Sequence, residues 1–379
     1  MRLHLAGLAG ALASALAAPA FAGNDNPKLD AEIARLMSVG KIPGVAVAVV
    51  ENGKVTHVTA MGARDAKGDP LTPDTVMYAA SITKATFGQY VMMLVDEGKL
   101  DLDKPIAAVL PKPLPEYEAY ADLAKDPRWK VITPRMLMTH SAGFPNFRWL
   151  NPDGKLDIKF DPGARYAYSG EGINLLQFVI EQGLGVKVGD EMNRRLFQPL
   201  GMTRSSMTWR DDFKGDLADG QHGDGKWEDH DGRSSVKAAG SLDTTITDLG
   251  KLAAAMVSGQ GLSPQARAER VKASLPIRSA FEFPPLTPEL GPDNARIGLA
   301  AGIGVVVFDG PQGHAFFKGG HNDITDNILV CVERGQRCVV VLTNSGVGQR
   351  IIPSVVKAAL GETGLPWGWE YHPGLPLKP

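Results

Sequence analysis

The sequence predicts an α/β (α+β) fold in which one antiparallel sheet is built from both ends of the chain and a mainly helical region is inserted between them. Short apolar runs rich in β-forming residues gather near the two ends, whereas the middle of the chain has helical and loop-rich patterns. Elements in this order are typical of a single sheet flanked by helices. We expect residues 23–75 and 296–379 to form the sheet-containing part and residues 76–295 the helical part.

The strands near the N-terminus are predicted at residues 42–50 and 55–62. The first is a nearly continuous apolar run, and the Asn52-Gly53 pair that follows it is a common two-residue hairpin turn. Near the other end, four short apolar runs with Gly-containing links predict a meander, followed by an amphipathic helix at residues 349–360. The four runs are residues 302–308, 314–318, 327–332 and 338–343.

The clearest helix of the middle region spans residues 81–97 and is followed by Gly98, a residue type that accepts the left-handed conformation at a helix end. Thr133 and Pro134 open a second helix, because Thr caps helices well and Pro suits the first helical position. Two further helices are predicted at residues 172–181 and 244–257.

Composition and charge exclude several classes of function. The 379 residues are 44% hydrophobic and 22% charged, which are values of a soluble globular protein. Forty basic residues against 42 acidic ones leave a net charge of −2, so the chain has no basic footprint for nucleic acid or for a membrane surface. We therefore expect a small molecule or a short peptide as substrate, and the oligomeric state stays open.

The first 22 residues have the features of a cleaved secretory signal peptide. Arg2 precedes an apolar run at residues 5–18, and Ala20 and Ala22 are small residues at the positions that a signal peptidase reads. The run is shorter than the roughly 18 to 20 apolar residues of a membrane span, which argues against a membrane anchor. We expect a mature chain from about Gly23, exported to the periplasm or secreted, with no stable membrane association.

Cys331 and Cys338 flank a polar, Gly-containing link between two of the predicted strands. If the turn centres on Arg334 and Gly335, the two thiols lie opposite each other in a hairpin. In an oxidising compartment they could form a disulfide, and otherwise they are two buried thiols that act as small apolar groups. In either case the pair is structural rather than catalytic.

Ser81 and Lys84 form a Ser-x-x-Lys motif, which occurs in serine acyl-transfer enzymes whose base is a lysine. The same pattern begins at Ser38, Ser234 and Ser354, so the motif alone is weakly specific. Among these serines, Ser81 opens a strongly apolar helix, where the helix dipole and a backbone N–H favour developing negative charge. Lys84 lies one turn later and can take the serine proton if burial lowers its pKa. The alternative is a capping serine beside a surface lysine.

Two later segments complete the candidate site. Tyr168 lies in the approach to the third predicted helix, where its phenol could pass a proton if a nearby cation lowers its pKa; the alternative is an aromatic residue that only packs. Lys318 ends a predicted strand and is followed by Gly319, Gly320 and His321. Lys318 could hold an anionic substrate group and lower the pKa of a neighbouring tyrosine, and the paired glycines would let a substrate backbone approach closely. The alternative for Lys318 is an edge lysine that protects the sheet from pairing.

The order and spacing of these motifs resemble the serine β-lactamase and penicillin-binding protein family, and are nearest to class C β-lactamases and to related esterases and D-aminopeptidases. Residues 132–143 look like the helix and turn between the first two motifs of that family, and residues 238–245 look like the glycine-containing entry to a later helix. The resemblance implies a single catalytic domain over residues 23–379, with the site in a cleft between the sheet-containing and helical parts.

By this resemblance Ser81 is the acylated nucleophile, and Lys84 is its base or proton partner. Tyr168 matches the tyrosine of Tyr-x-Asn and would pass the proton to the leaving group, while Lys318 matches the lysine of Lys-Thr-Gly. The backbone N–H groups of Ser81 and His321 would form the oxyanion hole. No metal or organic cofactor is implied. The predicted site residues are Ser81, Lys84, Tyr168 and Lys318 for catalysis and Gly320 and His321 for substrate binding.

The chain departs from the family pattern at two positions. Gly170 stands where the family often has Asn, so an amide for a substrate carbonyl is missing, and Glu171 is a candidate to compensate. Gly319 replaces the Thr of Lys-Thr-Gly, so a hydroxyl that helps to bind a β-lactam carboxylate is missing. The sequence thus predicts an exported serine hydrolase of an amide or ester: a β-lactam, a D-amino-acid peptide or a carboxylic ester. The alternative is a slow or inactive penicillin-binding-like protein that binds or senses cell-wall fragments.

Other polar groups are weaker candidates. Residues 222–231 are rich in His, Asp and Glu, but their spacing matches no standard zinc or calcium site and favours a solvated loop. His140 is expected to be a turn residue with a satisfied ring.

Overall fold

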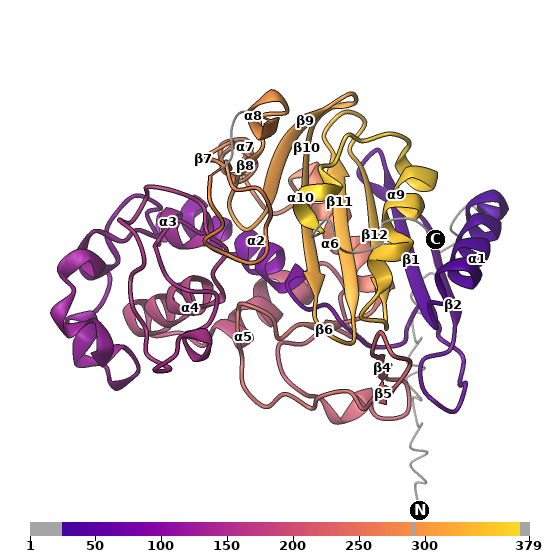
Figure 1. Ribbon diagram of the computed structural model, residues 1–379, viewed down its shortest axis with the longest axis horizontal. Helices are drawn as coiled ribbons and strands as arrows, with labels where there is room; N and C mark the ends of the chain where they lie inside the picture. Colours follow the sequence, from indigo (N-terminus) through magenta and orange to yellow (C-terminus); the bar gives the residue numbers. More distant parts are fainter. Residues whose placement is uncertain (1–24, 290–292, 372–379) are drawn as a thin grey trace, which may run out of the picture.

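The computed structural model describes residues 25–289 and 293–371, so the predicted signal peptide at residues 1–22 lies outside the described residues. Figure 1 shows a central sheet with helices on both sides and, beside it, a helical region that contains α3 (Pro134–Met138) and α4 (Gly170–Leu184). Within the described ranges, no helix is long and apolar enough to cross a membrane.

The two ends of the chain meet in one eight-stranded antiparallel sheet with the order β2-β1-β12-β11-β10-β9-β8-β7. The N-terminal hairpin pairs with the last strand of the chain, which confirms the predicted sheet from both termini. β7, from the part predicted to be helical, adds the far edge. The strands are β1 (Gly44–Glu51), β2 (Lys54–Gly62), β7 (Leu275–Pro276), β8 (Ala300–Ala301), β9 (Val306–Gly310), β10 (Gly313–His321), β11 (Asp326–Val332) and β12 (Arg337–Thr343).

Two small strand pairs lie outside this sheet, and helices cover it. The strand pairs are β3 (Met77–Tyr78) with β6 (Asp243–Thr244) and β4 (Gly220–Gln221) with β5 (Trp227–Glu228). The other helices are α1 (Pro27–Gly40), α2 (Ile82–Asp96), α5 (Val188–Met192), α6 (Ile246–Ser258), α7 (Pro264–Arg270), α8 (Asp293–Arg296), α9 (Ile352–Leu360) and α10 (Trp367–Glu370).

The sheet is buried on both faces, because successive side chains of a strand point to opposite sides. In β1, Val47 packs with the apolar residues of α1 and α9, whereas Ala48 belongs to the core on the side of α2 and α6. A Cβ added at Gly250 of α6 would lie 3.0 Å from the Cβ of Ala48. Small residues on both elements therefore let this helix lie close against the sheet.

The two predicted hairpins are present and lie next to each other. Asn52 and Gly53 have left-handed φ angles of 51° and 70°, as a two-residue turn of this kind requires. The N–H of Asn52 donates to the carbonyl of Gly335 in the β11–β12 turn at 2.9 Å. Cys331 and Cys338 are directly paired across β11 and β12, are fully buried and form a disulfide. The open choice between a disulfide and two thiols is thereby settled for this structure.

α2 is a core helix rather than an amphipathic surface helix. Twelve of its 15 residues are buried, as expected of a helix that is apolar on all sides. A Cβ at Gly88 would lie 2.7 Å from the carbonyl oxygen of Ile303, so this glycine lets the helix pass close to the chain before β9. Gly304 has a φ of 74° in the same turn. This turn explains why β9 begins at Val306 rather than at the predicted residue 302.

The predicted helices at residues 81–97, 172–181 and 244–257 correspond to α2, α4 and α6, and Thr133 caps α3 as expected. The helix predicted to begin at residue 349 begins at Ile352, after a single 3-10 turn at Gly348–Arg350.

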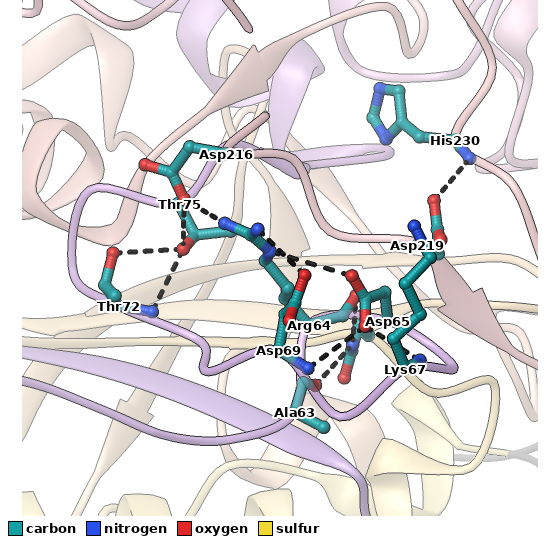
Figure 2. A network of polar contacts seen from close by, with 11 residues as sticks. Ala63, Arg64, Asp65, Lys67, Asp69, Thr72, Thr75, Asp216, Asp219 and His230 are labelled. Carbon is teal, nitrogen blue, oxygen red and sulfur yellow. Dashed lines mark hydrogen bonds and ion pairs between the residues drawn. The ribbon is translucent and has the colours of Figure 1, made fainter. Parts of the chain in front are cut away.

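A polar network fixes the loop that leads from β2 toward α2 (Figure 2). Arg64 contacts Asp216 at 3.1 Å and Asp69 at 3.2 Å, and Thr75 donates to the same Asp216 at 2.8 Å. The backbone N–H of Asp219 donates to the carbonyl of Arg64 at 2.9 Å. The chain that approaches Ser81 is therefore held by a segment about 150 residues later in the sequence.

Candidate active site

Ser81 stands at the N-terminus of α2, directly after a tight turn. Ala80 has a φ of 46°, a left-handed conformation that is unfavourable for a residue with a Cβ. Thr83 supports this turn: its hydroxyl donates to the carbonyl of Ala80 at 2.5 Å and accepts from the N–H of Leu242 at 3.1 Å. The pairing of β3 with β6 holds the strand that leads into the turn. The local strain is thus maintained by neighbouring structure, and Ser81 is presented with a partly exposed side chain.

Two side chains meet at the hydroxyl of Ser81. Lys84 Nζ lies 2.8 Å from Ser81 Oγ, and the Tyr168 hydroxyl donates to the same oxygen at 2.7 Å. Lys84 Nζ also donates to the carbonyl of Ala239 at 2.5 Å. The structure therefore brings the first and second sequence motifs to one atom.

Burial sets the protonation of both partners. Burial lowers the pKa of Lys84 well below its usual range, and the positive charge of Lys318 lowers this pKa further, while Glu282 acts in the opposite direction. Burial raises the pKa of Tyr168, which outweighs the lowering by Lys318 and by the contact with Ser81. Lys318 thus lowers the pKa of Tyr168 as expected, but the net shift is upward because burial is the larger effect. A neutral amine has a lone pair that can accept the Ser81 proton while the phenol keeps its own.

His140 supports the ring of Tyr168, a contact that no sequence spacing indicated. The two rings stack with centroids 4.6 Å apart, and the N–H of Ser169 donates to His140 Nδ1 at 3.1 Å. His140 has a φ of 55° in its turn, as expected of a turn residue with a satisfied ring. Burial and the charges of Lys84 and Lys318 lower the pKa of His140, so its ring is neutral beside the phenol.

Lys318 is buried next to Tyr168 and is already paired. Its Nζ lies 4.9 Å from the centroid of the Tyr168 ring and 3.4 Å from Glu282 Oε1. Tyr166 also donates to Glu282 Oε1, at 3.0 Å. Burial acts to lower the pKa of Lys318, but Glu282, Tyr168 and Glu370 together outweigh burial and raise this pKa, so the lysine stays charged. Sequence reasoning missed Glu282, which lies in a loop without a motif.

Gly320 brings the strand edge against the start of α2. A Cβ at this position would lie 2.9 Å from the backbone nitrogens of Ser81 and Ile82 and 2.6 Å from the carbonyl oxygen of Ala79. The pairing of β10 with β9 extends to Phe317, so the strand beyond it borders the candidate site. The backbones of β10 and of the α2 N-terminus thus meet beside Ser81, where the predicted oxyanion hole requires them.

A cavity of about 400 Å³ opens beside Ser81. Gly319, His321, Asp326 and Glu370 are among its lining residues. A Cβ built at Gly319 would overlap Oε1 of Glu370, so this carboxyl group occupies the space of the side chain that Gly319 lacks. Burial lowers the pKa of His321 to about 4, which leaves its ring neutral. Glu370 comes from α10 near the end of the described chain, and no sequence pattern indicated it.

An amide is present near position 170 although Gly170 lacks one. The side chain of Asn146 lines the cavity, and its Oδ1 accepts from the N–H of Gly170 at 3.0 Å. The ring of Phe147 fills the place of a side chain at Gly170, with its Cζ 2.6 Å from an added Cβ. Glu171 pairs with Arg148 at 3.0 Å and accepts its backbone N–H at 2.9 Å. Glu171 therefore holds the neighbouring turn. It does not compensate for the missing amide, contrary to the role that the sequence had suggested for it.

The other polar candidates lie apart from this site. His222 pairs with Glu228 at 2.9 Å, and the ring of His230 lies 3.1 Å from Asp243. Figure 2 shows that His230 reaches Asp219 through its backbone nitrogen. In the part of the chain that the structure describes, no group of three His, Cys, Asp or Glu residues could hold a metal ion.

Comparisons with known proteins agree with this geometry. The family model described as Beta-lactamase matches residues 29–353. The lovastatin esterase of Penicillium rubens is 27% identical over 223 residues, which cover 50% of this chain and 56% of that protein. Esterase EstB of Burkholderia gladioli is 25% identical over 202 residues, which cover 46% of this chain and 50% of that protein. The chain thus spans about half the length of these curated relatives.

A solved structure shares the fold. The D-alanine carboxypeptidase AmpC from Burkholderia cenocepacia has a TM-score of 0.69 to this chain and covers 88% of it, with 98% of its own length matched. The sequence identity is 20%, so this likeness concerns the fold alone. It confirms the predicted α/β architecture with an antiparallel sheet and an inserted helical region.

Proposed function

The chain belongs to the Beta-lactamase family, and we propose that it is an exported serine hydrolase that cleaves carboxylic esters or amides through an acyl-enzyme at Ser81. The observation that carries the proposal is the position of Ser81 Oγ, 2.8 Å from Lys84 Nζ and 2.7 Å from the Tyr168 hydroxyl. A serine hydroxyl becomes a good nucleophile when a base takes its proton, and a lysine with a lowered pKa is such a base. The similarity to two esterases supports this reaction class.

The proposed reaction has two balanced halves. Lys84 takes the proton of Ser81, and Oγ attacks the carbonyl carbon of the substrate. The charge on the carbonyl oxygen is received by the N–H groups of Ser81 and His321, and the intermediate then collapses with loss of the alcohol or amine. Tyr168 and the protonated Lys84 supply the proton that the leaving group needs. Water then attacks the carbonyl carbon of the acyl-enzyme, and the same groups transfer protons in the reverse order. The acid leaves, and Ser81 regains its proton.

The surroundings of Gly319 favour substrates without a carboxylate near the scissile bond. The missing hydroxyl removes one donor for an anion, and Glu370 occupies the vacated space. The charge of Lys318 is already paired with Glu282. We therefore propose esters and uncharged or cationic amides as substrates, ahead of β-lactams, whose carboxylate would meet a carboxyl group.

Export to the periplasm or the medium is part of the proposal. It rests on the signal-like pattern of residues 1–22. The disulfide between Cys331 and Cys338 supports it, because disulfides persist in oxidising compartments and are rare in the cytosol. We propose that the mature protein has no stable membrane association and acts on small molecules or short peptides.

The test is covalent labelling of the purified protein with a fluorophosphonate, followed by intact mass. We expect one adduct in the wild type and none in Ser81→Ala. Ser354→Ala is a matched control, since Ser354 belongs to a second Ser-x-x-Lys pattern in α9. The wild type should also turn over a short-chain 4-nitrophenyl ester faster than a penicillin. A wild type that neither labels nor turns over any ester would overturn the proposal and favour a binding role.

A further inference from the structure

We propose that Glu370 binds a protonated amine of the substrate, so that this hydrolase prefers esters and amides with a primary ammonium group close to the scissile carbonyl. The inference rests on the proposed function and names the substrate class of the same site. It begins from the carboxyl group that fills the side-chain space of Gly319 in the cavity beside Ser81.

The carboxyl group of Glu370 is buried without a partner. The residue is 3% exposed, and neither of its side-chain oxygens has a hydrogen-bond partner among the described residues. A buried polar group without a partner is unfavourable, and native proteins rarely keep one without a use. A primary ammonium group carries three N–H donors and no acceptor, as lysine does, so it supplies what these oxygens lack.

The charges around Glu370 leave room for one more cation. Glu282 and Glu370 both act on Lys318, which is the charged lysine of this site because burial keeps Lys84 neutral, and Asp326 acts on Glu370. Burial and the charge of Glu282 raise the pKa of Glu370, and burial raises the pKa of Asp326 to about 7. A bound ammonium group would let the Glu370 carboxyl group ionise, with release of one proton. The other titratable groups near these acids are Tyr166, Tyr168, Tyr371 and His321.

The position of Glu370 limits how far the amine can be from the reacting carbonyl. Gly319 precedes Gly320, whose backbone lies against the amide of Ser81, and consecutive Cα atoms are about 3.8 Å apart. The carboxyl group over Gly319 lies on the opposite face of β10 from the contact of Gly320 with Ser81, one residue along the strand, and both Glu370 and Ser81 line the same cavity. A short amino-acyl group, with the nitrogen a few bonds from the carbonyl, fits this span. Long-chain amines would place the nitrogen beyond it.

The experiment compares alanine methyl ester with methyl isobutyrate, in which a methyl group replaces the ammonium group at the same position. We would measure kcat/KM for both esters at pH 7 by methanol release, with both enantiomers of the alanine ester. The proteins are the wild type, Glu370→Gln and the control Glu362→Gln. Glu362 lies in the same C-terminal region, but its side chain is 64% exposed and pairs with Lys357 at the surface.

The ratio of the two kcat/KM values should fall at least tenfold in Glu370→Gln and stay within twofold in Glu362→Gln. The ratio is taken on one preparation, so a partly unfolded variant lowers both rates and leaves it unchanged. The intrinsic reactivity of each ester also cancels between wild type and variant. An unchanged ratio in Glu370→Gln overturns the inference. So does a wild-type ratio that is no higher than the ratio of the rate constants with which hydroxide hydrolyses the same two esters.

A second measurement separates this inference from the proposed function. Isopropylammonium should slow the fluorophosphonate labelling of the wild type and have no such effect on Glu370→Gln. If Ser81 is labelled but the amine gives no protection, and the neutral ester is cleaved as well as the cationic one, only the amine site is refuted. If neither ester reacts and Ser81 is not labelled, the proposed function fails and the amine preference fails with it.

Discussion

Replacement of Gly320 by alanine should remove most of the acyl-transfer activity and leave the fold in place. The added Cβ would lie 2.6 Å from the carbonyl oxygen of Ala79 and 2.9 Å from the nitrogens of Ser81 and Ile82, whereas ordinary contact begins at 3.4 Å. All three atoms belong to the backbone, so the contact cannot be relieved by a side-chain rotation. β10 and the start of α2 must separate by about 0.5 to 0.8 Å.

This separation acts on the two N–H groups that would hold the carbonyl oxygen. One donor is on α2 and the other on β10, so both cannot keep hydrogen-bond geometry to one oxygen when the elements move apart. Loss of one such donor costs about 100- to 1000-fold in kcat, or roughly 3 to 4 kcal/mol of transition-state stabilisation. We therefore expect kcat for a short-chain ester to fall by about two to three orders of magnitude.

The assay measures kcat with a 4-nitrophenyl ester and the melting temperature of each protein. Gly232→Ala is the matched control, since its added Cβ would meet Trp209 at an ordinary 3.8 Å. A Gly320→Ala protein with kcat within threefold of the wild type would refute the placement of the oxyanion hole. An equal loss in Gly232→Ala would show that the effect does not come from the contact with α2.

Three further predictions concern charge, the disulfide and a helix cap. Lys318→Met should shift the acid limb of the pH profile of kcat/KM to a pH about one unit higher. The Nζ atoms of Lys84 and Lys318 both lie within 5 Å of the centroid of the Tyr168 ring, so they are at most about 10 Å apart. At that distance, with an effective dielectric constant of about 20, two positive charges repel each other by about 1.7 kcal/mol. The direction is upward because the base, Lys84, must be neutral and loses a neighbouring charge that lowers its pKa; an unmoved limb contradicts this. Cys331→Ala with Cys338→Ala should lower the free energy of unfolding in urea by about 2.5 kcal/mol, and equal stability would refute that value. Ser169→Ala removes the 3.0 Å side-chain cap of α4 and should cost about 1 kcal/mol in the same urea assay.

The parts of the fold that could be predicted are those whose cause is local. The turn at Asn52 and Gly53 follows from the left-handed φ angles that these residue types accept, and α2 follows from an unbroken apolar run. β7 and β8 could not be predicted, because each has two residues and shows no period. They are strands because β9 extends the sheet and pairs with β8. Their existence depends on tertiary structure.

The same distinction applies to the candidate site. Ser81 and Lys84 are three residues apart on one helix, so their contact follows from helical geometry. Glu282 and Glu370 come from a loop and a four-residue helix, and they meet Lys318 through the packing of the C-terminal segment against β10. Gly319 showed that a hydroxyl is absent, but a missing side chain does not indicate which group fills the space. The acidic character of the cavity is thus a property of the fold.

Burial also decides which group takes the proton of Ser81. Tyr168 and Lys84 both lie within hydrogen-bond distance of Oγ, so geometry alone allows either to act as the base. Removal from water disfavours the charged form of each group, which raises the pKa of the phenol and lowers that of the amine. The same effect therefore makes Tyr168 a poor base and Lys84 a good one. Lys318 escapes this effect because Glu282 and its other neighbours together outweigh its burial, and its charge adds to the burial that keeps Lys84 deprotonated. The charge of Lys318 thus reinforces the direction of proton transfer that burial sets, without a contact to the nucleophile, whereas Glu282 opposes it.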